Sequence, residues 1–240
     1  MTNGPNTTPT ADQPSERQPA ARFLAFLAAF FAVWTIRATQ FDSIDDAFPS
    51  TISRAAFSTA LKALLWIVPG AIFVRRVSHG SPAAYLGLTA QPSVRVWRHC
   101  LAAIALFLAI VTTVELTLGP KSLSLTPLWE LPPALWLLQL GLSPLIEELL
   151  FRGLILKELL RFARPSVAIV ADSLLFVGIH LPYWLSHQPV DSELATNSFG
   201  VFVFSLLAGY LGLKSSSIWP PTLAHIANNT LALILVNPVN

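Results

Sequence analysis

Seven stretches of this chain are candidates to cross a lipid bilayer, although the sixth of them is short. A membrane helix needs about 20 mostly apolar residues, because the hydrocarbon core of a bilayer is about 30 Å thick. The expected spans are residues 22–39, 56–74, 99–118, 131–156, 166–184, 199–213 and 218–236. Only 12% of the 240 residues are charged, against about 25% in a soluble domain. The sequence therefore predicts an all-α, polytopic membrane helix bundle of about seven transmembrane helices.

Composition divides the chain near residue 21. Residues 1–21 are rich in Thr, Pro and Asn and contain little that a core could bury. They are predicted to form a disordered cytoplasmic tail. Residues 22–240 are expected to form a single transmembrane domain, in which residues 22–125 hold the first three spans.

The lysines and arginines between the spans predict the orientation of the bundle. Connections rich in these residues stay on the cytoplasmic side of a membrane. They gather before the first span and in alternate connections after it, at Arg17, Arg22, Arg75, Arg76, Arg95, Arg98, Lys157, Arg161, Arg164 and Lys214. We therefore expect a cytoplasmic N-terminus and a C-terminus outside. The net charge of +2 is small, and no nucleic-acid partner is expected.

Several ionisable or strongly polar groups remain inside the expected spans. A charge at the centre of a membrane helix costs about 2.5–3.5 kcal/mol, so such groups usually face the interior and are paired. They are Arg37, Lys62, Glu115, Glu147, Glu148, Arg152, Asp172, His180, His225, Asn228 and Asn229. Arg37 and Lys62 lie near span ends, where long side chains are expected to reach the headgroup region. Asp172 is expected to pair with Arg161 or Arg164.

The stretch "SPLIEELLFRG", residues 143–153, holds two adjacent glutamates in an apolar run. Glu148 and Arg152 are four residues apart, so they share a helix face and can form an ion pair. Glu147 is rotated by about 100° from Glu148 and is predicted to stay free of the arginine. Pro144 removes one helical hydrogen-bond donor just before it and favours a kink.

Two further spans each offer a polar stripe. Asp172, Phe176 and His180 follow one another at intervals of four residues, and so do His225 and Asn229. A carboxylate and an imidazole can activate a water molecule as a general base. A second imidazole and a carboxamide can donate hydrogen bonds to a developing oxyanion. This set favours hydrolysis of an amide bond without a covalent intermediate.

The same residues form three motifs in a fixed order. "EELLFRG" fits E-E-x-x-x-R, "FVGIH" fits F-x-x-x-H and "HIANN" fits H-x-x-x-N. Together they resemble the type II CAAX prenyl protease family, also called the CPBP intramembrane glutamic endopeptidases. The resemblance covers about residues 130–236, and it implies a protease-like core at 126–240 formed by the last four spans. The first three spans carry no motif and are expected to be peripheral.

The resemblance implies a role for each motif residue and a class of substrate. The implied catalytic residues are Glu147, which acts with His180 on the water, and His225 and Asn229, which form the oxyanion hole. The implied supporting residues are Glu148, Arg152 and Phe176. The implied substrate is a membrane protein or lipidated peptide in the lipid bilayer. No metal or other cofactor is implied.

Three alternatives remain open at the level of the sequence. Glu147, His180 and His225 would be a possible zinc ligand set, although no H-E-x-x-H pair places two histidines on one helix. Buried carboxylates and histidines also mark proton relays, which would suit a proton-coupled transporter. A non-proteolytic immunity or scaffold protein of the same fold is the third.

Overall fold

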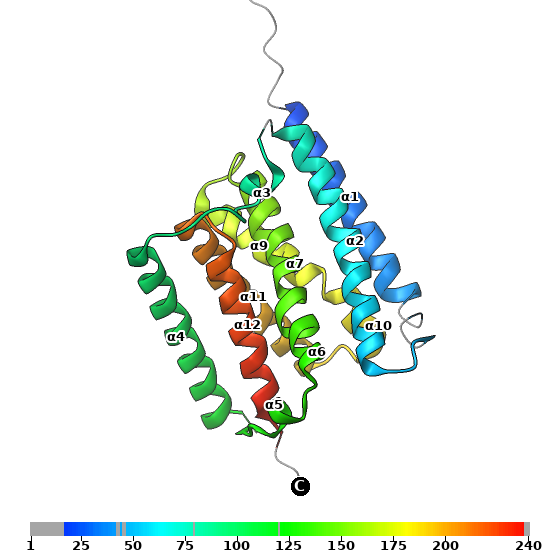
Figure 1. Ribbon diagram of the computed structural model, residues 1–240, viewed down its shortest axis with the longest axis vertical. Coiled ribbons are helices and arrows are strands. Elements are labelled where there is room, and N and C mark those ends of the chain that lie inside the picture. Colours follow the sequence, from blue (N-terminus) through cyan, green and yellow to red (C-terminus); the bar gives the residue numbers. More distant parts are fainter. Residues whose placement is uncertain (1–16, 42–43, 45–46, 79, 120, 238–240) are drawn as a thin grey trace, which may run out of the picture.

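The computed structural model describes residues 17–41, 44, 47–78, 80–119 and 121–237, and it is a bundle of long helices (Figure 1). Most of the predicted disordered tail, residues 1–16, lies outside the described residues. Residues 17–21 belong to helix α1 (Arg17–Gln40), so the helix begins earlier than predicted. Pro19 does not prevent this, because a proline is tolerated in the first turn of a helix.

Within the described residues, six helical segments are long and apolar enough to span a membrane. They are most of α1, α2 (Thr51–Val77), α4 (Val94–Thr117), residues Pro133–Leu159, residues Pro165–His187 and α11 (Ser192–Ser215). The protein is therefore a multi-pass integral membrane protein, as predicted.

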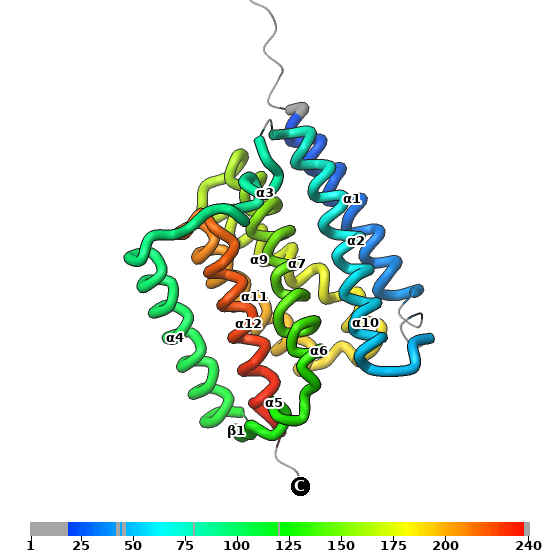
Figure 2. Tube along the Cα trace, in the orientation of Figure 1, coloured from blue at the N-terminus to red at the C-terminus, as the bar shows by residue number. Residues whose placement is uncertain are grey.

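The seventh expected span coincides with α12 (Trp219–Ile234), which has 16 residues. Its length is about 24 Å, which is shorter than the hydrocarbon core. It nevertheless runs alongside α11 and α4 through the bundle (Figure 2). Beyond it, β2 (Leu235–Val236) pairs antiparallel with β1 (Ser122–Leu123), close to α5 (Thr126–Glu130).

The fourth span is not a regular α-helix. It consists of α6 (Pro133–Leu135), the π-helix η2 (Trp136–Leu142), α7 (Ser143–Leu150), the π-helix η3 (Phe151–Ile155) and α8 (Leu156–Leu159). Pro144 lacks the backbone N–H of a regular turn, and the chain before it is wound in wide turns. π-Helical turns are rare and occur often at functional sites. Here they flank both glutamates of the motif.

The fifth span is broken near its end. Helix α9 (Pro165–Gly178) stops at Gly178, and α10 (Leu181–His187) begins just after His180. The Trp34 indole of α1 donates a hydrogen bond of 2.8 Å to the Ile179 carbonyl, which the break leaves exposed to it. The break therefore places His180 at a corner against α1 rather than inside a straight helix.

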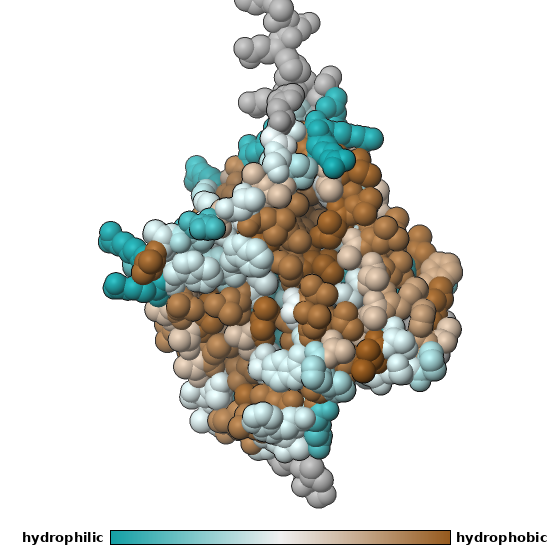
Figure 3. All heavy atoms as spheres, viewed as in Figure 1, coloured by the Kyte–Doolittle hydropathy of each residue, from teal (hydrophilic) through white to brown (hydrophobic). Residues whose placement is uncertain are grey.

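Lipid-facing surface and core are both apolar in this chain. Figure 3 shows hydrophobic side chains over much of the middle of the visible face, and large side chains such as Leu24, Leu64 and Leu106 are exposed. In a bilayer this arrangement is favourable, because the surrounding lipid is itself apolar. The core is distinguished instead by large buried rings, among them Trp66, Phe151 and Phe176.

A short connection closes one end of the bundle. Helix α3 (Pro82–Tyr85) docks on α8, where the Tyr85 hydroxyl donates to Glu158 and the Lys157 ammonium donates to the Tyr85 carbonyl. Burial and the hydrogen bond to Glu158 raise the pKa of Tyr85. Gly153 permits this docking, because a Cβ atom there would lie 2.9 Å from the Leu86 carbonyl oxygen.

Replacing Gly153 with alanine should therefore loosen the α3 connection. We expect Gly153→Ala to lower the free energy of unfolding by about 1–3 kcal/mol, as overpacking does. Gly200→Ala is the matched control, because nothing lies within 4 Å of a Cβ atom at that position of α11. The control should be neutral or stabilising by up to about 1 kcal/mol. Thermal unfolding in detergent measures both, and equal midpoints would contradict the assigned packing.

Candidate active site

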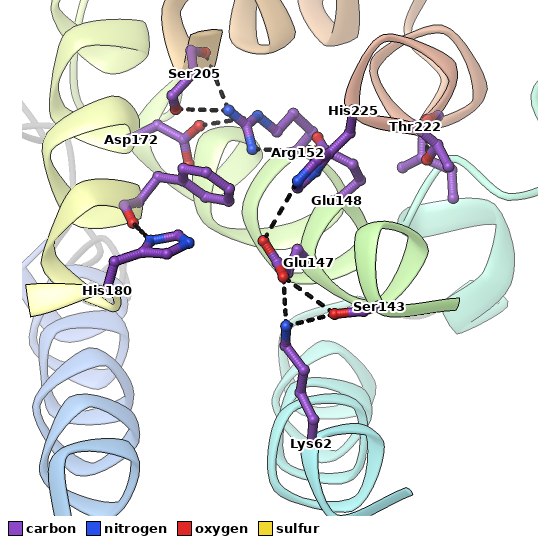
Figure 4. A network of polar contacts seen from close by, with 12 residues as sticks. Lys62, Ser143, Glu147, Glu148, Arg152, Asp172, His180, Ser205, Thr222 and His225 are labelled. Atoms are coloured by element: carbon purple, nitrogen blue, oxygen red, sulfur yellow. Dashed lines mark hydrogen bonds and ion pairs between the residues drawn. The ribbon is translucent and has the colours of Figure 1, made fainter. Parts of the chain in front are cut away.

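Arg152 is the centre of a fully buried polar network that joins three helical segments (Figure 4). Its guanidinium donates a hydrogen bond of 3.1 Å to Glu148, so the predicted ion pair is confirmed. The same guanidinium donates to the Ser205 hydroxyl at 2.6 Å and to the Ser205 carbonyl at 3.0 Å. Arg152 thereby ties the motif helix α7 to α11.

Asp172 was expected to pair with Arg161 or Arg164, and this prediction is wrong. Its carboxylate lies 3.5 Å from Nε of Arg152, as an ion pair without hydrogen-bond geometry. Arg161 instead pairs with Glu158 at 2.9 Å. The reason is the direction of the Asp172 side chain, which is fully buried in α9 and faces the bundle interior.

Glu147 points away from Arg152, as its rotation on the helix predicts, but it is not free of cations. Its Oε1 atom accepts a short hydrogen bond from the Lys62 ammonium of α2. The Ser143 hydroxyl lies between them, 2.9 Å from Lys62 and 3.4 Å from Glu147 Oε1. The two adjacent glutamates thus have separate cationic partners from different parts of the chain.

The expectation that Lys62 extends to the headgroup region is therefore wrong. The predicted span began at residue 56, whereas α2 begins at Thr51. Lys62 thus lies about 16 Å from the start of the helix, which is about half the thickness of a hydrocarbon core. At that depth the ammonium pairs inside the bundle, over the ring of Trp66 at 4.7 Å. The second span is consequently part of the site and not peripheral.

His225 lies between the two glutamates. Its Nδ1 atom is 2.8 Å from Glu148 Oε1, and its Nε2 atom is 3.8 Å from Glu147 Oε2. Because an ionised carboxylate can only accept a hydrogen bond, Nδ1 of His225 is the donor in its contact with Glu148 and carries the proton. Within the described residues Glu147 Oε2 is buried and has no hydrogen-bond partner. The Glu147 oxygen that has no hydrogen-bond partner, Oε2, therefore faces the Nε2 atom of the His225 ring.

His180 has a defined tautomer. Its Nδ1 atom lies 2.8 Å from the Phe176 carbonyl, which can only accept, so Nδ1 is the donor. In the neutral ring the Nε2 atom is then left as a proton acceptor. Phe176 packs between the two parts of the site, with the Arg152 guanidinium 4.6 Å and the His180 ring 5.2 Å from its ring centroid. Its position agrees with the supporting role that the resemblance implies.

Asn229 is not brought into this network. It follows His225 by one turn on α12 and is half-buried, but its carboxamide makes no hydrogen bond to the residues that the structure describes. Its place in an oxyanion hole stays a prediction.

A cavity of about 420 Å³ reaches the site. Glu147 and His180 both line it, together with Lys62 and Ser143. Three further residues of the site, Lys62, Ser143 and Ser205, lie outside the three motifs and were not predicted to belong to it. The one available signal was the charge of Lys62 inside an apolar span, because serines are common in membrane helices and give no comparable signal.

The zinc alternative would need its three ligands to converge. Across the described ranges, no group of three or more His, Cys, Asp or Glu side chains is arranged to hold a metal ion. The cation closest to Glu147 there is the Lys62 ammonium.

Comparison with known families identifies the C-terminal half of the chain. Residues 129–231 match the family described as Rce1-like, type II CAAX prenyl endopeptidase. This match, over a stretch that holds all three motifs, confirms the resemblance predicted from them. The comparison with curated proteins finds no match. The comparison with solved structures finds none either.

Removing the central guanidinium should have a large effect on stability. Arg152→Met leaves Glu148 and Asp172 as buried carboxylates beside each other, and breaking such a buried pair costs about 3–5 kcal/mol. Lys121→Met is the control, because Lys121 and its partner Glu115 are both partly exposed, at 35% and 29%, and pairs of that kind contribute about 0–1 kcal/mol. Chemical denaturation in detergent compares them. Similar losses for the two variants would contradict the central role of Arg152.

Proposed function

We propose that the protein is an intramembrane glutamic endopeptidase that hydrolyses a peptide bond of a membrane-associated protein or lipidated peptide. The observation that carries the proposal is the geometry of Glu147. One carboxylate oxygen is held by Lys62 and Ser143, and the other is buried without a hydrogen bond and faces His225. A carboxylate oriented in this way beside a cavity is suited to act as a general base.

The first chemical step is the activation of water. A water molecule in the cavity between Glu147 and His180 would donate a proton to Glu147 Oε2 or to Nε2 of His180. The resulting hydroxide attacks the carbonyl carbon of the scissile bond, and the protonated base then returns the proton to the leaving amine. General base catalysis of this kind contributes about 10²–10⁴-fold to a rate.

The second requirement is a donor for the oxyanion of the tetrahedral intermediate. Because Nδ1 of His225 donates to Glu148, the Nε2 atom donates only when the ring is the imidazolium. Glu148 therefore orients the ring and balances its charge. The carboxamide of Asn229 is the second proposed donor, and the Lys62 ammonium lies close enough to Glu147 to add a positive field to the site.

The match to this family favours this proposal over a proton-coupled transporter. The non-proteolytic scaffold alternative shares the fold and the family, so an activity measurement is needed to separate it from a protease.

Glu147→Gln should abolish proteolysis, because the amide cannot accept the proton of the water. We expect the rate to fall by about 10²–10⁴-fold. Glu115→Gln is the matched control, since Glu115 lies on α4 and pairs with Lys121 at 3.3 Å away from the site. The measurement compares membrane proteomes of cells with the active protein and with each variant, and scores new C-termini. Termini that persist in a folded Glu147→Gln variant would refute the glutamate mechanism.

Lys62→Met removes the cation that holds Glu147 and keeps the length of the side chain. We expect activity to fall by about 10²-fold, the size of effect that misplacing a reacting group causes. Lys62→Arg keeps the charge and should retain more activity than Lys62→Met.

Stability separates this charge effect from simple misfolding. Lys62→Met leaves Glu147 buried without its cation, so the double variant Lys62→Met/Glu147→Gln should unfold at a higher temperature than Lys62→Met alone. If the double variant is no more stable, or if Lys62→Arg is as inactive as Lys62→Met, the ion pair does not position Glu147.

A further inference from the structure

The cavity at Glu147 lies toward one end of the bundle. Its lining comes from the last turns of α1, the first half of α2, the start of the fourth span and the end of the fifth. Representative lining residues are Trp34 and Arg37 of α1, Ser58 and Thr59 of α2, Gln139 of η2, and Tyr183 and Trp184 of α10. In Figure 1 the end of α1 and the start of α2 lie together at the lower right, beside α10.

The clustered cations lie at the opposite end. They lie near the other ends of α1, α2 and the fourth span, at the start of α4 and the end of α11, and in the connection before α9, at Arg22, Arg75, Arg76, Arg95, Arg98, Lys157, Arg161, Arg164 and Lys214. Figure 1 shows the start of α1 and the end of α2 together at the top. The site cavity therefore lies in the half of the bundle that is away from the arginine-rich end.

The arginine-rich end is also closed by packing. Between it and Glu147 the fourth span places Phe151, Leu154 and Ile155, all with 0% exposure. The connection after α2 is fastened over this end, where the Ser217 hydroxyl donates to the Ala90 carbonyl at 3.1 Å and the Trp219 indole donates to the Leu88 carbonyl at 2.9 Å. These contacts leave the cavity end as the route to Glu147.

We propose that the substrate reaches Glu147 from the arginine-poor side of the membrane. By the positive-inside rule, that side of the membrane faces away from the cytoplasm. The substrate class is then a membrane-anchored peptide segment that has already been translocated, and the cleaved bond lies outside the cytoplasm. This inference rests on the proposed endopeptidase function and on the predicted orientation of the chain.

The lining of the cavity suits such a segment. Trp34, Tyr183 and Trp184 supply flat aromatic surface with polar edges, which is favourable at the depth of the headgroups. Ser58 and Thr59 add hydroxyl groups that can hydrogen-bond the backbone of an extended peptide. The lining thus offers contacts to both the side chains and the backbone of a peptide that enters from the interface.

The direction of access can be tested by cysteine labelling, which does not depend on catalysis. The chain has a single cysteine, Cys100, which is buried, so Cys100→Ala provides the background. Ser58→Cys reports on the cavity, and Ser81→Cys, an exposed position before α3, reports on the arginine-rich end. A membrane-impermeant maleimide is added to intact cells and to sealed inverted vesicles.

We expect Ser58→Cys to be labelled in intact cells and Ser81→Cys to be labelled in inverted vesicles. The reverse pattern would overturn the proposal. Labelling of Ser58→Cys from neither side, but only after denaturation, would also overturn it, because the cavity would then be closed to the exterior.

The test of the direction of access can fail independently of the test of protease activity. Glu147→Gln should leave the labelling pattern unchanged, since the variant retains the cavity. Where proteome comparison finds C-termini that depend on Glu147, we expect them in segments outside the cytoplasm. Such termini on cytoplasmic segments would refute outside access and leave the protease function standing, whereas an absence of dependent termini would refute the function but not the direction of the cavity.

Discussion

One buried guanidinium determines how the C-terminal helices meet. Arg152 is 2% exposed, and it contacts Glu148 on its own span, Asp172 on α9 and Ser205 on α11. Isolated charges are expensive in a membrane interior, so each of these groups is tolerated only while the others are in place. The aromatic ring of Phe176 covers the guanidinium. The packing of three spans thus depends on satisfying one cation.

The consequence for the site is that the two adjacent glutamates have different tasks. Glu148 is committed to Arg152 and to Nδ1 of His225, so its role is to hold other groups. Glu147 is turned by about 100° on the helix and retains an oxygen without a hydrogen bond. Nearest neighbours in sequence are therefore separated by helix geometry into a structural carboxylate and a proposed reactive one.

Local spacing predicted those features that helix geometry alone determines. The bundle of membrane helices, the Glu148–Arg152 pair and the rotation of Glu147 all follow from intervals within one span. The partners of Lys62 and Asp172 did not follow, because they depend on which helices lie side by side and on where each helix begins. An error of five residues at the start of α2 was enough to place Lys62 near the headgroups instead of beside Glu147. The π-helical turns around α7 were likewise not predictable from Pro144, which indicates a disturbance but not its form.

Lys62 lies on α2, outside the matched residues 129–231. The three family motifs are thus not a self-sufficient unit in this chain, since the cation that holds their first glutamate comes from a region without any motif. Two chains with identical motifs and different second spans would carry the same residues in different electrostatic settings. If the motif region were joined to the N-terminal helices of another protein, the three motifs would be preserved. Glu147 would nevertheless lose the cation that pairs with it, because Lys62 lies on α2.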